Sequence, residues 1–147
     1  MKPFTFRLER LLNYRGYLER RAQVDLFNAK NEVRAKEEEI ENLKRNKMNI
    51  WEECSDEGSR GMNVPLFQIY RSFIKKLDLD LEEAHRRLEE LEEKVKAKTA
   101  ALREETIRKK TLENLKDLQR KRYMVQTDRE EQKEMDEMVI LRKGAGH

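Results

Sequence analysis

Apolar residues recur at heptad spacing through two long stretches of the chain. In the second stretch they stand three or four residues apart, at Leu77, Leu81, Ala84, Leu88, Leu91, Val95 and Leu102, and Lys98 alone interrupts the row. The first stretch has the same spacing from Leu26 to Cys54, with Lys36 and Lys47 on the row. Such a row is typical of a long helix that buries a narrow stripe against another helix. The pattern therefore predicts two long helices.

A cluster of turn-forming residues separates the two stretches. Two glycines, two serines, Asp56 and Asn63 lie between residues 55 and 63, and Pro65 follows, where a first helical turn tolerates it. One short connection between two helices with one apolar stripe each favours an antiparallel arrangement. We therefore predict an all-α fold, a single antiparallel coiled-coil hairpin over residues 1–147. Its parts are a helix at about 5–55 with Thr5 as its cap, a loop at about 56–63 and a helix at about 65–142.

The two helices differ in length, so the second one has a part that the first cannot reach. With the loop centre near Gly61, facing residues have numbers that sum to roughly 122, and pairing ends near Leu118. At ~1.5 Å per residue, the rest of the second helix overhangs by about 35 Å. Apolar residues continue there, at Tyr123, Met124, Val125, Met135, Met138, Val139, Ile140 and Leu141. An apolar stripe on a lone helix predicts a protein partner.

The charge of the chain is high but mixed. Charged residues make up 43% and hydrophobic ones 37%, which leaves too little apolar material for a thick globular core. The net charge is +3. The segment from Arg103 to Arg122 holds eight basic and four acidic residues, whereas Asp128 to Met138 holds six acidic and two basic. These bands are either ordinary solvent-facing helix surface or an electrostatic register for a protein partner.

The sequence offers no chemistry of its own. It has no glycine-rich phosphate loop, nucleophile elbow or paired-histidine motif, so we predict neither an enzyme nor a bound cofactor or metal. We expect Cys54 to serve as a small apolar residue of the row and His85 to face solvent. A single cysteine, no apolar run of about 20 residues and no signal-peptide core predict a protein that works inside the cell.

Three stretches, in order along the chain, resemble the FliJ family, the small soluble component of the bacterial flagellar type III export apparatus. The first is Phe4-x-Phe6-x-Leu8-x-x-Leu11-Leu12. The second is Gly61-Met62-x-Val64 with Tyr70-x-x-Phe73-Ile74-x-x-Leu77-Asp78, and the third is Glu131-Gln132-Lys133-Glu134-Met135-Asp136-Glu137. The segments 26–51 and 82–115 match the family only as a heptad pattern.

The resemblance implies an antiparallel coiled coil like the central stalk of rotary ATPases, with the two chain ends inside the hexameric export ATPase ring. Carried onto matched positions, it implies ring contacts at Phe4, Phe6, Leu8, Leu11, Leu12, Tyr123, Gln132, Lys133, Met135, Asp136 and Glu137. It implies contacts with the cytoplasmic domain of the membrane export gate protein at Tyr70, Phe73 and Leu77. It further implies an escort role for export chaperones, and a place in the cytoplasm at the inner face of the cell membrane.

Two other functions remain open on the residues alone. A helical nucleic-acid binder would use the basic band at 116–122, but the balanced net charge and the acidic segment that follows argue against a nucleic-acid partner. A generic coiled-coil scaffold would dimerise through the heptad row. A hairpin that pairs both its rows within one chain is instead expected to be a monomer when free.

Overall fold

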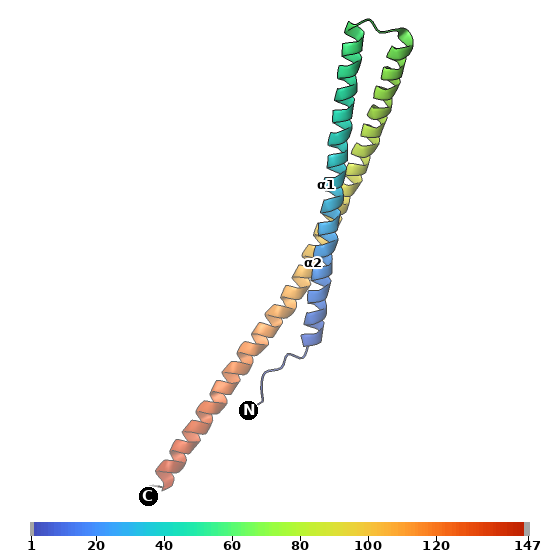
Figure 1. The fold of residues 1–147 in the computed structure, drawn as a ribbon. Helices are drawn as coiled ribbons and strands as arrows, with labels where there is room; N and C mark the ends of the chain where they lie inside the picture. Colours follow the sequence, from blue (N-terminus) through green and yellow to red (C-terminus); the bar gives the residue numbers. More distant parts are fainter. Residues whose placement is uncertain (1, 146–147) are drawn as a thin grey trace. The chain divides into compact units, whose positions relative to one another are not determined.

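The computed structural model describes residues 2–145 and consists of two helices, as the heptad pattern predicts. Helix α1 spans Glu9–Ser59 and helix α2 spans Val64–Ala145, joined by one short turn (Figure 1). The described residues contain no strand, so the fold is all-α. The contacts divide the chain into a tip unit, Ala22–Leu102, and a base unit, Met1–Arg21 with Arg103–His147, and each contains an antiparallel pairing of α1 with α2.

Helix α1 begins and ends later than the sequence predicts. Thr5 is not its cap, because the first helical residue is Glu9, whose amide donates to the Phe6 carbonyl at 3.2 Å. A carboxylate in this first turn is favourable beside the partial positive charge of the helix amino terminus. Residues 2–8 form instead a non-helical segment, the amino-terminal strap. Because α1 also continues to Ser59, the connection shrinks to residues 60–63.

The turn between the helices is built from the residues that the sequence marked. Gly61 has a φ of 88°, a left-handed conformation that glycine adopts without a steric penalty. Asn63 caps α2. Its side-chain Oδ1 accepts a hydrogen bond from the Leu66 amide at 2.9 Å, and its backbone carbonyl accepts one from the Phe67 amide at 3.1 Å. Pro65 lies in the first turn of α2, where its missing amide leaves no hydrogen bond unmade.

In the tip unit an apolar seam holds the helices together. Its buried side chains come from both helices and include three residues spaced seven apart on α2: Ala29, Ile40, Cys54, Leu77, Ala84 and Leu91. Ion pairs flank the seam, between Lys47 and Asp78 at 2.5 Å and between Lys94 and Glu32 at 3.1 Å. Lys47, predicted to lay its stem along the row, is half-buried and carries its charge to the opposite helix.

In the base unit ion pairs replace most of the buried side chains. Phe6 is the only buried hydrophobic residue among those described there. Three ion pairs cross between the helices, Arg15 with Glu105 at 3.8 Å, Lys109 with Glu19 at 3.3 Å, and Lys116 with Glu9 at 2.8 Å. Gly16 is buried within this pairing, and α1 runs through it without a break.

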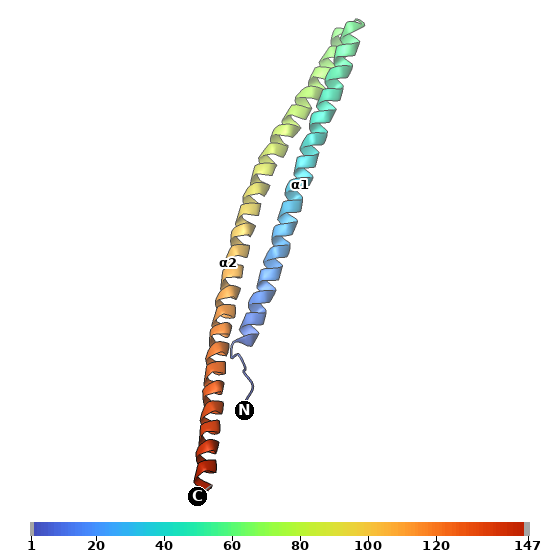
Figure 2. The ribbon, with the colours of Figure 1, turned by 90° about the vertical axis from the view of Figure 1, so that its left-hand side faces the viewer.

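The pairing in the base unit reaches Tyr123, five residues beyond the expected end near Leu118. Two contacts show how far the pairing extends: the ion pair between Glu9 and Lys116, and the packing of Phe4 on Tyr123. Beyond Tyr123, α2 continues with no other described segment of the base unit beside it, as Figure 2 shows for its red end. Residues 128–145 are all exposed. We refer to residues 124–145 as the carboxy-terminal overhang.

Candidate partner-binding surfaces

The amino-terminal strap closes the paired part of the base unit. The ring of Phe4 packs on the ring of Tyr123 with centroids 5.7 Å apart, and the Tyr123 hydroxyl donates to the Lys2 carbonyl. Phe6 is 7% exposed, because it is buried at the start of the pairing. Leu8 and Leu11 are exposed, and Leu12 is half-buried. Among the expected ring contacts at this end, Leu8 and Leu11 therefore offer the accessible apolar surface.

The overhang contains the other expected ring contacts, and all of them are exposed. Gln132 donates to the Asp136 carboxylate at 3.2 Å, one turn further along the same helix, and Met135 is 63% exposed. Lys133 and Glu137 also face solvent. Further apolar side chains on the overhang, each at least half exposed, extend the surface: Met124, Val125, Met138, Val139, Ile140 and Leu141. A segment this apolar, with no neighbour among residues 2–123 of its unit, is typical of a binding surface.

The three expected gate contacts in the tip unit do not share one surface. Leu77 is 7% exposed and packs in the apolar seam, so it stabilises the helix pair and is not available to a partner. Tyr70 is half-buried at the edge of α2. Burial raises the pKa of its hydroxyl, and the carboxylates of Glu53 and Glu57 raise it further, so the group stays protonated at neutral pH. Phe73 alone is exposed, at 53%.

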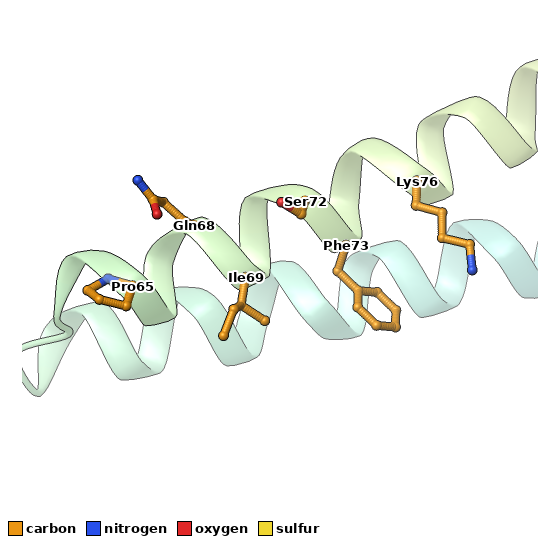
Figure 3. Close-up of a pocket in the computed structure, with 6 residues that line it drawn as sticks. All are labelled: Pro65, Gln68, Ile69, Ser72, Phe73 and Lys76. Atoms are coloured by element: carbon orange, nitrogen blue, oxygen red, sulfur yellow. The ribbon is translucent and has the colours of Figure 1, made fainter.

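Phe73 belongs to a shallow groove along one side of α2, the tip face. Its lining residues come from successive turns of one helix, as Figure 3 shows: Pro65, Gln68, Ile69, Ser72, Phe73 and Lys76. Ile69 is 62% exposed and lies one turn before Phe73. Ile69 is absent from the expected gate contacts, because those contacts come only from positions that match the family motif. The spacing of Pro65, Ile69 and Phe73 by four residues would have placed them on one helix face.

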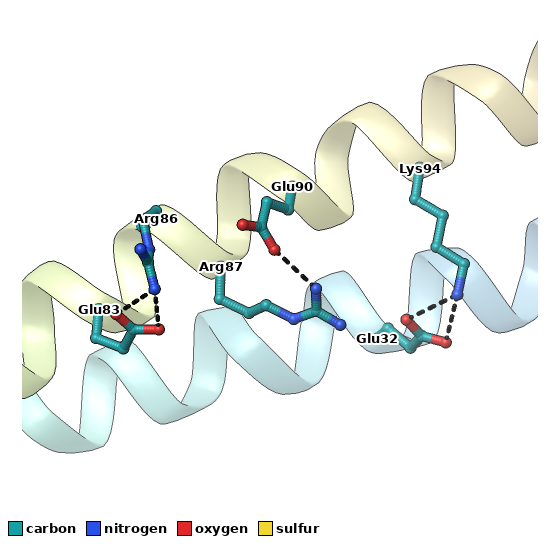
Figure 4. Close-up of polar contacts among 6 residues, drawn as sticks. All are labelled: Glu32, Glu83, Arg86, Arg87, Glu90 and Lys94. Carbon is teal, nitrogen blue, oxygen red and sulfur yellow. Dashed lines mark hydrogen bonds and ion pairs between the residues drawn. The ribbon is translucent and has the colours of Figure 1, made fainter.

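Several surface charges of the tip unit are paired within the unit. Arg86 pairs with Glu83 at 2.6 Å and Arg87 with Glu90 at 2.8 Å along α2, while Lys94 reaches Glu32 on α1 (Figure 4). Exposed pairs of this kind contribute about 0.2–1 kcal/mol each and mainly keep the surface neutral.

The base unit keeps free positive charge near the overhang. The exposed residues Arg120, Lys121 and Arg122 take part in none of the ion pairs found among residues 2–145. The cationic cluster therefore remains available to an anionic partner. It directly precedes the overhang, whose segment from Asp128 to Glu137 is mainly acidic.

Glu19 is the titrating group that the base unit perturbs. A hydrogen bond from the Thr106 side chain is the main cause of a lowered pKa for the Glu19 carboxyl. Burial acts in the opposite direction, and the ammonium group of Lys109, at 3.3 Å, lowers the pKa further. Glu19 is thus held as a carboxylate between two groups of α2. Its place inside the pairing indicates a structural role.

No group of three or more His, Cys, Asp and Glu side chains within residues 2–145 is arranged to hold a metal ion. Cys54 is buried in the seam, and His85 is exposed on α2, both as the sequence predicts. Within the same residues, neither helix has a stretch long and apolar enough to cross a lipid bilayer.

Comparison with known proteins gives one match. The family model described as "Flagellar FliJ protein" matches residues 4–144, which is nearly the whole chain. Neither the curated proteins nor the solved structures gave a match.

Proposed function

The chain belongs to the FliJ family and is thus a protein of flagellar export, and from this premise we propose that it acts as the central stalk of the export ATPase ring. In this proposal the amino-terminal strap and the overhang enter the hexameric ring, and the tip face contacts the cytoplasmic domain of the export gate protein. The protein works in the cytoplasm, peripherally at the inner face of the cell membrane. Escorting export chaperones is a further role, and the chain itself catalyses no step.

The overhang is the observation that carries the proposal. Residues 128–145 are all exposed, and seven apolar residues of the overhang are each at least 50% exposed. Fully burying one such side chain contributes about 1.5–3 kcal/mol, so a few of them supply ample free energy for docking. A ring of subunits could surround this segment on all sides, because no part of the described chain packs against it.

The stalk would act on the ring by differential binding. A ligand shifts an equilibrium between two arrangements only when it binds one of them more tightly. If the overhang contacts the active arrangement of the ring more tightly, each ~1.4 kcal/mol of difference raises the active population relative to the inactive one about tenfold. The overhang and the tip face are both on α2, which is one continuous helix from Val64 to Ala145. The same helix thus carries both partner contacts.

The test measures ATP hydrolysis by the purified export ATPase with and without the purified chain. We expect the full-length chain to stimulate hydrolysis and a chain that lacks residues 124–147 to lose this effect. The deletion should leave the paired helices intact, because residues 128–145 of the overhang are all exposed in the described part of the chain, and circular dichroism checks this. Stimulation by the shortened chain would contradict the proposal.

A second variant separates the two contacts. Phe73→Ala removes the exposed aromatic side chain of the tip face. It should weaken binding to the gate domain while leaving ATPase stimulation unchanged. Phe27→Ala is the matched control, since Phe27, at 60%, is also an exposed phenylalanine of the tip unit but lies on α1. Equal loss of both activities in the Phe73 variant would contradict the division between tip and base.

The nucleic-acid alternative has one specific observation in its favour, the free cluster of Arg120, Lys121 and Arg122. Binding through phosphates would weaken steeply as salt is raised. A duplex-binding assay at physiological salt distinguishes the alternatives, because the stalk proposal expects no binding there.

A further inference from the structure

The exposed side of α2 around the start of the overhang carries its own heptad row. Lys121, Met124, Asp128, Glu131, Met135 and Met138 follow one another at steps of three and four residues. All six are exposed. At 100° per residue such positions share one face of a helix. The row therefore has the spacing of a coiled-coil seam, although no segment of the described chain covers it.

The charges along this row are self-complementary. The cluster of Arg120, Lys121 and Arg122 is basic, and the segment from Asp128 to Glu137 holds six acidic and two basic residues. Ten residues separate Lys121 from Glu131, which corresponds to about 15 Å along the helix. A helix with opposite charges at a fixed separation fits a copy of itself that runs in the opposite direction.

We propose that two copies of the chain pair through this row as an antiparallel, two-fold symmetric dimer when the ring is absent. With the symmetry axis at the level of Gln126, Lys121 of each copy lies opposite Glu131 of the other, and Met124 lies opposite Asp128. The segment 120–122 then faces 130–132 twice. Met135 and Met138 of each copy extend along the exposed side of the other α2, beside Asp117, and the stems of the methionines supply the apolar contact.

A parallel pair is disfavoured by the same charges. It would place Lys121 opposite Lys121, Asp128 opposite Asp128 and Glu131 opposite Glu131, so that every charged position of the row would face its own kind. A second copy also suits the overhang better than a uniformly charged partner does. The basic and acidic bands need a surface with both signs in reverse order, and another copy of α2 presents that order.

The proposed dimer departs from the sequence expectation of a free monomer, which considered only the two rows that pair within the chain. The pairing itself does not depend on the proposed function. Its consequence does, because the dimer covers the overhang that we assign to the ring. The ring and the second copy then compete for one surface, and assembly into the ring separates the two copies.

The test is sedimentation equilibrium of the full-length chain across a concentration series at low and high ionic strength. We expect a monomer–dimer equilibrium that weakens as salt is raised, because exposed ion pairs are screened. The variants R120E/K121E/R122E and E130K/E131K/E134K should each dimerise at least about tenfold more weakly, while their equimolar mixture should recover a dimer. The control E82K/E89K/E92K reverses three exposed charges of the tip unit and should dimerise like the unchanged chain.

Orientation is tested by cross-linking in a Cys54→Ser background. Met124→Cys chains should form disulfides with Asp128→Cys chains faster than with one another, whereas a parallel pair would favour the self-linked product. Circular dichroism confirms that each variant keeps its helices.

A chain that stays monomeric at every concentration would overturn the pairing, as would a mixture of reversed variants that fails to recover a dimer. If such a monomer still stimulates the ATPase, the proposed function stands without the pairing. A dimer that follows the charge reversals but fails to stimulate the ATPase supports the pairing and contradicts the proposed function.

Discussion

Replacing Leu91 by alanine tests whether the apolar seam supplies the stability of the tip unit. Leu91 is 5% exposed and lies seven residues from Ala84 in the row of buried residues on α2. The substitution removes the equivalent of about three methylene groups, which at ~0.8 kcal/mol each gives about 2.4 kcal/mol of lost burial. The cavity adds to this cost, and buried leucine-to-alanine changes span about 2–5 kcal/mol.

The lower half of that range applies to Leu91. The seam between two helices is open to solvent along both sides, so neighbouring stems can close over the space. Alanine is also a slightly better helix former than leucine, which offsets a small part of the loss. We therefore expect the free energy of unfolding to fall by about 2–3 kcal/mol.

Urea denaturation followed by circular dichroism measures this change. The midpoint should fall while the slope of free energy against urea stays the same, because the surface exposed on unfolding hardly changes. Leu79→Ala is the matched control on the same helix. Leu79 is 56% exposed, so its loss should cost less than about 1 kcal/mol. Equal destabilisation by the two substitutions would refute the assignment of the seam.

Three further substitutions test the base unit and the turn. Gly16→Ala should stabilise the chain by about 0.4–1 kcal/mol in thermal or urea melting, because an added Cβ would meet only side-chain atoms, of Arg20 at 3.5 Å and Lys109 at 4.0 Å; destabilisation would show that this packing is tighter than described. Glu19→Gln removes a carboxyl whose pKa is lower in the folded chain than in the unfolded one. The stability that this carboxyl provides is present above its ordinary pKa of 4.5 and is lost as the pH falls through the lowered value, so wild type and variant should converge in acid, and a constant difference across pH would contradict the pKa shift. Asn63→Ala removes the cap of α2 and should cost about 1 kcal/mol, whereas an unchanged melting midpoint would show that the Leu66 amide finds another acceptor.

Much of the fold could be predicted from the sequence because a heptad row is a direct record of helix pairing. The row from Leu77 to Leu91 predicted the seam, and the cluster around Gly61 predicted the turn. The predicted start of α1 at Thr5 was wrong. Thr5 suits a cap chemically, but the strap buries Phe6 and the helix begins only at Glu9. When tertiary packing determines where a helix begins, the residues around that position do not reveal it.

The partner surfaces were harder to predict, because position on a motif does not determine exposure. Leu77 belongs both to the heptad row and to the family motif. Its side chain can either pack in the seam or contact a partner, and the structure places it in the seam. Phe73 and Ile69 share the tip face by helix geometry, which the motif did not express. In the overhang the sequence was sufficient, because a long helix without a second row opposite it must remain exposed.

The contrast between the two units bears on how the chain comes apart. Six buried side chains and two cross-helix ion pairs hold the tip unit, whereas the described part of the base unit has Phe6 as its one buried hydrophobic side chain and three cross-helix ion pairs. Concentrated salt weakens the ion pairs and strengthens apolar association. In such a solution the backbone amides around Gly16 should exchange their hydrogens for deuterium well before those around Ala84. In concentrated salt the two helices would therefore separate first in the base unit, where the chain ends lie, and only later in the tip unit.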